Sequence, residues 1–124
     1  MADVAHTETK LGIQMAGGIA AALVTWTPLT STNTGGDAWE NRAFGDMAVQ
    51  VSGTFGGATV LIEGSNDNSN WFTLNDPQGT ALSIATSGKI ETILEAPRYI
   101  RPTSSGGGGT TALSVIIMAR RGNR

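Results

Sequence analysis

Residues 53–74 constrain the fold more than any other stretch of this chain, because they read as a strand, a tight turn and a second strand. Strand side chains alternate between two faces, so Val60 and Ile62 lie on the face opposite Leu61. Short polar side chains at 66–70 bond to their own backbone and favour a reversal of the chain there. A two-stranded unit of this kind must bury its apolar face against other strands to be stable. The segment therefore predicts an all-β domain.

Six further segments carry strand patterns and are separated by turn-forming residues. They cover residues 19–27, 46–55, 81–85, 90–94, 98–102 and 111–119. The 111–119 segment is apolar on both faces, which is typical of a strand in the middle of a sheet or at an interface. The prolines around 98–102 favour an edge or a corner. The total of about eight short strands, at intervals of about ten residues, predicts an antiparallel β-sandwich or jelly roll.

The sandwich is predicted to be one domain over residues 19–121, since a chain of 124 residues is long enough for one core. Residues 1–18 lack a sustained period and predict an extended N-terminal arm or a loosely attached first strand, often mobile until a partner binds. Residues 122–124 form a short C-terminal tail. The longest unpatterned stretch, 29–45, predicts a loop that is functional or mobile. The glycine-rich stretch 104–109 predicts a flexible hairpin connection.

Charge and cysteine content exclude several classes of function. The net charge is −2, so nucleic acid is not an expected partner. The sequence has no cysteine, which excludes disulfides, thiolate metal sites and a cysteine nucleophile. The apolar run 15–24 spans half of what a bilayer crossing needs, so no membrane anchor is expected. The charge order of the N-terminus is wrong for a secretory signal, which predicts synthesis in the cytoplasm.

Only 15% of the residues are charged, against about 25% in an ordinary soluble domain. A surface with so few charges is typical of a protein that is partly covered by partners. It is also common among β-domains that have no such partners.

No group of side chains indicates catalysis, a metal or a cofactor. His6 is the only histidine and lies in the predicted arm, where it is expected to be solvent-exposed. The Asn and Asp residues at 66–70 lack the glycine and distal glutamate of a calcium loop. Glu91 and Glu95 have no spacing that selects them as an acid–base pair. The glycines at 106–109 are not followed by the lysine and helix of a phosphate-binding loop. The sequence therefore predicts a protein that is not an enzyme.

The aromatic residues and the basic C-terminus offer candidates for partner binding. Trp71, beside Phe72 in a strand, is expected in the core, whereas Trp39 in the long loop is expected to meet a ligand or partner. Arg120, Arg121 and Arg124 form a basic tail after the last strand. These arginines are either solvated or docked on carboxylates of a neighbouring protein.

Several sequence phrases carry a family resemblance. They are the sequence motifs GTFGGATV at 53–60, EGSND at 63–67 with a tryptophan after it, PRYIRP at 97–102 and VIIMARR at 115–121. With these phrases the chain resembles small structural proteins of tailed bacteriophages, of the type of capsid decoration or cement proteins. The resemblance covers residues 49–121 and consists of β-turn motifs, not of a catalytic signature.

The resemblance implies a virion protein that is made in the bacterial host cytoplasm, binds the major capsid protein on the outer surface of the shell, and stabilises contacts between capsomers. It implies a homo-oligomer, either a dimer or a trimer, because closed symmetry would match the symmetry axes of a shell. The residues expected at the partner interface are Ala5, His6, Leu11, Ile13, Met15, Trp39, Arg120 and Arg121. The alternative is a discoidin-like carbohydrate-binding module on a virion surface or tail, supported by the phrase at 64–67 followed by Trp71.

Overall fold

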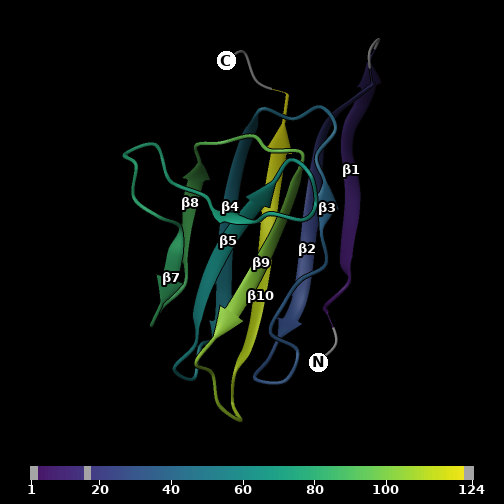
Figure 1. Ribbon diagram of the computed structural model, residues 1–124. Coiled ribbons are helices and arrows are strands. Elements are labelled where there is room, and N and C mark those ends of the chain that lie inside the picture. Colours follow the sequence, from purple (N-terminus) through teal and green to yellow (C-terminus); the bar gives the residue numbers. More distant parts are fainter. Residues whose placement is uncertain (1–2, 16–17, 122–124) are drawn as a thin grey trace.

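Two antiparallel sheets stack face to face in the computed structural model, which describes residues 3–15 and 18–121, with side chains described outside 12–20 (Figure 1). The first sheet has the order β1-β2-β10-β4-β8, formed by His6–Met15, Gly18–Leu29, Ala112–Arg120, Asp46–Thr54 and Lys89–Ile93. The second has the order β3-β9-β5-β6, formed by Trp39–Glu40, Tyr99–Ser105, Thr59–Ser65 and Phe72–Thr73. The short strand β7, Ser83–Ala85, pairs with β5 as well. The predicted all-β sandwich is confirmed.

The core lies between the two sheets and follows the period-two pattern of the strands. In β4, Met47, Val49 and Val51 are buried, and in β5 the buried pair is Val60 and Ile62. The strand β10 pairs with β2 on one side and with β4 on the other, so its predicted central position is confirmed. Its inward side chains are fully buried, and of its outward ones Ser114, Ile116 and Met118 are half-buried.

The segment 98–102 is not an edge or a corner, as its prolines suggested. It belongs to β9, which pairs along seven residues with β5 and on its other side with β3. Pro102 is tolerated there because proline lacks only the donor of the ladder. Its carbonyl oxygen still accepts a hydrogen bond from the backbone N–H of Gly36, at 2.8 Å.

The glycine-rich connection after β9 is not a hairpin, because β9 and β10 lie in different sheets. The connection after β4 crosses between the sheets at the same end of the molecule. Thr111 ties the two crossings together, since its buried hydroxyl donates to the carbonyl oxygen of Phe55 at 2.8 Å and accepts from the N–H of Gly108 at 3.0 Å. This end of the sandwich is therefore held by side-chain contacts as well as by glycine turns.

The N-terminal segment joins both sheets. Residues 6–15 form the edge strand β1, which pairs with β2 in the first sheet. Immediately before it, the N–H of Val4 donates to the carbonyl of Gly35 at 2.7 Å, and its carbonyl accepts from Asp37 at 2.9 Å, at the edge of the second sheet. The loop predicted at 29–45 is accordingly structured in part, because 34–36 and β3 both hydrogen-bond to β9.

Candidate partner interface

A groove of about 590 Å³ lies on the side of the sandwich where β1 and β3, the edge strands of the two sheets, come together. We call it the edge groove. It is lined by His6, Glu8, Lys10, Ala38, Trp39, Glu40, Arg42, Ala43, Phe44 and Arg121. Charged side chains of both signs thus surround an apolar floor.

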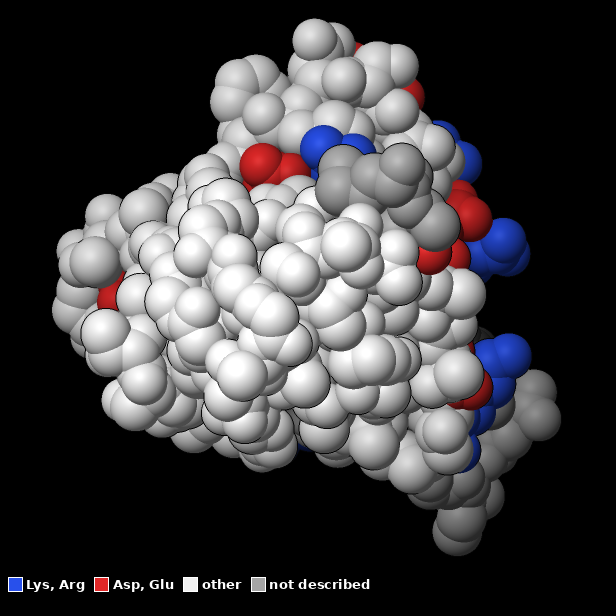
Figure 2. All heavy atoms as spheres, turned by 90° about the horizontal axis from the view of Figure 1, so that it is seen from below, with Lys and Arg blue, Asp and Glu red and all other residues white. Residues whose placement is uncertain are grey.

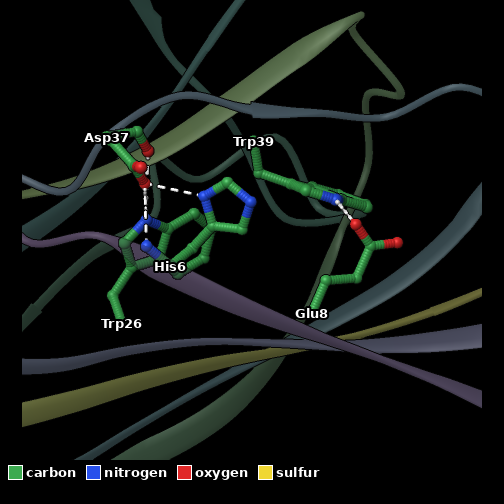
Figure 3. A network of polar contacts seen from close by, with 5 residues as sticks. All are labelled: His6, Glu8, Trp26, Asp37 and Trp39. Atoms are coloured by element: carbon green, nitrogen blue, oxygen red, sulfur yellow. Dashed lines mark hydrogen bonds and ion pairs between the residues drawn. The ribbon is translucent and has the colours of Figure 1, made fainter.

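Trp39 contributes to that floor, and it belongs to the short strand β3 within the stretch that was predicted as a loop. Its side chain is only 1% exposed, because it packs into the core from β3. The ring of Phe44 stacks on it with centroids 6.4 Å apart and planes inclined by 19°. Its indole Nε1 donates to Glu8 Oε1 at 3.3 Å, from β3 across to β1 (Figure 3). Trp39 therefore joins the two sheets at this side instead of presenting its face to a ligand.

His6 is anchored at the start of β1 and is not simply solvent-exposed. Its backbone N–H and its Nδ1 both donate to Asp37 Oδ1, at 3.0 and 2.7 Å (Figure 3). The same carboxylate oxygen accepts a hydrogen bond from Trp26 Nε1 at 3.1 Å, and Trp26 is fully buried. One aspartate thus fastens the first strand, the long loop and the core to one another.

Asn41 shapes the rim of the edge groove, and nothing in the sequence pattern singled it out. This asparagine is buried, and its Nδ2 donates to the carbonyl oxygens of Phe44 at 2.8 Å and Pro97 at 3.3 Å. Its Oδ1 accepts from the N–H of Phe44 at 2.9 Å. A buried amide that is satisfied in this way holds the 41–44 turn and so places Phe44 over Trp39.

Two arginines flank Glu40 on the rim. Arg98 donates to Glu40 Oε2 from Nε at 3.1 Å and from Nη2 at 2.9 Å, and Arg42 Nη2 donates to Oε1 at 3.1 Å. The hydrogen bonds from Arg98, followed by the charge of Arg42, lower the pKa of Glu40, and the bond to Glu40 raises the pKa of Arg98. Because both arginines are exposed and Glu40 is only half-buried, the network orients the side chains more than it stabilises the fold.

The structure brings together three of the residues expected at the partner interface, namely His6, Trp39 and Arg121, which all line the edge groove. Ala5 is exposed just before β1, and Leu11 is half-buried on the opposite side of that strand. The side chains of Ile13 and Met15 and the tail at 122–124 lie outside the described residues. Arg120 points away from the edge groove and forms an ion pair with Asp46, Nη2 to Oδ2, at 3.6 Å.

A second groove, of about 630 Å³, lies beside the β5–β6 turn. The predicted turn at 66–70 is organised by Asp67, whose Oδ1 accepts from the N–H groups of Ser69 and Asn70 at 2.9 and 2.8 Å. These backbone bonds, the one from Asn70 above all, hold the pKa of Asp67 well below its usual range. Phe72 is 71% exposed and lines this groove.

Trp71 is only half-buried and does not belong to the core, contrary to prediction. The guanidinium of Arg101 covers its ring at 4.0 Å from the centroid, and Arg101 is held by Glu63 at 3.0 Å. One face of this indole is thus already occupied by a cation.

Within the described part of the chain, no cluster of three or more His, Asp and Glu side chains could hold a metal ion. No helix in that part is long and apolar enough to cross a bilayer. Neither family models nor curated proteins nor solved structures show a match to this chain.

Proposed function

We propose that this chain is a non-enzymatic structural protein of a tailed bacteriophage, which binds the major capsid protein on the outside of the shell and stabilises contacts between capsomers. The family resemblance of residues 49–121 suggests the class, and the distribution of charge supports an adhesive role. Figure 2 looks onto the end that carries the two crossing connections, and there a broad uncharged surface has Lys, Arg, Asp and Glu only around its margin. In this view most of the charged residues lie toward the side of β1, and a few lie at the other margins.

We assign the capsid contact to the edge groove, which lies on the charged side of the molecule beside β1. It offers carboxylates on Glu8 and Glu40 beside cations on Lys10 and Arg42, over the apolar ring of Phe44. The outer edge of β1 lies next to it and pairs with no described strand, so a strand of a partner could add there. An ordered shell repeats such a contact many times, so each can be weak.

Charge reversal in the edge groove tests the proposal. Removing residues 1–16 is not a clean test, because that deletion removes β1 and the anchor at Asp37. Lys10→Glu with Arg42→Glu changes only exposed side chains of the groove. The control is Lys89→Glu, the same change on β8 at the opposite edge of the sheet.

The binding partner in the assay is phage heads purified from a strain that lacks the gene for this chain. The wild type and the Lys89→Glu control are expected to sediment with the heads, whereas the double variant loses about tenfold in affinity or more. A wild type that stays in the supernatant would refute the capsid assignment. Equal binding by the double variant would refute the role of the edge groove.

A carbohydrate-binding module remains the second candidate, and the exposed Phe72 favours it. Sugar sites combine an apolar ring platform with polar groups, and the second groove places Asn70, Asn75 and Glu95 beside that ring. Glycan-array binding that is lost on Phe72→Ala, together with no binding to heads, would support this candidate. Trp39 has no part in it, since its face is buried.

A further inference from the structure

The outer face of the first sheet is apolar at its centre, although a solvated face of an antiparallel sheet is normally polar. Leu23, Met118 and Ala48 lie in one row across β2, β10 and β4. Ile116 lies in the next row, and Ile90 continues that row on β8, where its side chain is 64% exposed. We call this surface the outer face.

The remainder of the outer face is neutral. Its other described side chains between β1 and β8 are mainly Thr, Ser and Gln, such as Thr27 and Ser114, whose hydroxyl oxygens lie 2.7 Å apart. Among the described residues, the charged side chains on this face are Arg120 and Asp46, which pair with each other at one end. An apolar centre inside an uncharged polar rim is the arrangement of a protein–protein interface.

The size of the outer face matches what a stable dimer buries. Five strands about 4.8 Å apart give a width of about 24 Å, and the nine residues of β10 give a length of about 30 Å. The face therefore measures about 700 Å², and two such faces bury about 1,400 Å² together, within the range of about 1,200–2,000 Å² for specific complexes.

We infer that the outer face binds the same face of a second copy of this chain, so that two first sheets pack across a twofold axis. A partner with charges at this position would bury them without counter-charges, which is costly. A partner surface without unpaired charges avoids that cost. A second copy of the outer face is such a surface, because its Arg120 and Asp46 already pair with each other. A twofold axis uses the same patch on both copies, and two sheets that pack face to face are the arrangement of sandwich cores. The role of this dimer on a capsid rests on the proposed function, whereas the pairing of the two copies does not require a capsid.

The mass in solution tests this pairing directly. Light scattering and sedimentation velocity at micromolar concentration are expected to give twice the chain mass of 12.8 kDa for the wild type. The variant Ile90→Lys with Met118→Lys introduces two cations into the outer face and is expected to give 12.8 kDa with an unchanged circular dichroism spectrum. The control Phe72→Lys places a cation at an exposed apolar position on the other sheet and is expected to stay dimeric.

Cross-linking provides a second measurement that does not depend on how the lysine variant folds. The chain has no cysteine, so Met118→Cys supplies a single thiol at the centre of the outer face, and Ser83→Cys supplies one on an exposed site of the second sheet. Mild oxidation is expected to trap a covalent dimer of the first variant and not of the second. A monomeric wild type, or a dimer that survives Ile90→Lys with Met118→Lys, would overturn the pairing. A monomer that still binds phage heads would leave the capsid assignment standing, which separates the two proposals.

Discussion

The replacement Trp39→Ala tests whether this tryptophan holds the sandwich together at the edge groove. An aromatic side chain buries about 150–250 Å², and truncation of a buried Trp to Ala typically costs about 3–5 kcal/mol. Trp39 is 1% exposed, and its replacement also removes the stacking contact with Phe44. We therefore expect a loss of stability in the upper part of that range, about 4–5 kcal/mol. The bond to Glu8 adds little, because that exposed carboxylate is solvated again by water.

The assay is urea and thermal unfolding followed by far-ultraviolet circular dichroism. For a chain of 124 residues we expect the melting temperature to fall by about 12–20 °C. The matched control is Phe72→Ala, an aromatic truncation at a side chain that is 71% exposed, where we expect a change within about 0.5 kcal/mol. If Trp39→Ala cost less than about 1 kcal/mol, or no more than Phe72→Ala, the assignment of Trp39 to the core would be wrong.

Two further predictions concern the β5–β6 region. In Gly64→Ala the new Cβ would lie 2.6 Å from Pro97 Cγ and 2.7 Å from Leu74 Cδ2, so we expect the free energy of unfolding in urea to fall by about 1–3 kcal/mol. The control Gly45→Ala, where no atom lies within 4 Å of the new Cβ, should be nearly neutral. A neutral Gly64→Ala would contradict this packing. The pKa of Asp67 is lowered in the folded state, so its contribution to stability is present above the ordinary value of 3.8 and is lost as the pH falls below it. Asp67→Asn should therefore flatten the fall of the unfolding free energy below that pH, and an acid-unfolding curve identical to that of the wild type would disprove the role of this carboxylate.

The architecture could be predicted because side-chain alternation is a local property of each strand. The buried residues of β4 and β5 and the two apolar faces of β10 follow from residues that are neighbours in the sequence. The edge groove could not be predicted in the same way. Asn41 reaches Pro97 across 56 positions, and Trp39 reaches Glu8 across 31, so no local window contains both partners of either contact.

The sequence by itself determined the class of fold, the central position of β10 and the polar turn around Asp67, because short-range backbone preferences and period-two burial suffice for these features. Only the tertiary structure decided that Trp39 is buried and Trp71 is not, that 6–15 pairs as β1, and that charges of both signs meet beside Phe44. The physical reason is that the exposure of a side chain depends on what covers it. Trp39 is covered by Phe44 and contacts Glu8 of β1, 31 positions away, whereas Trp71 near the edge of its sheet is covered by one arginine.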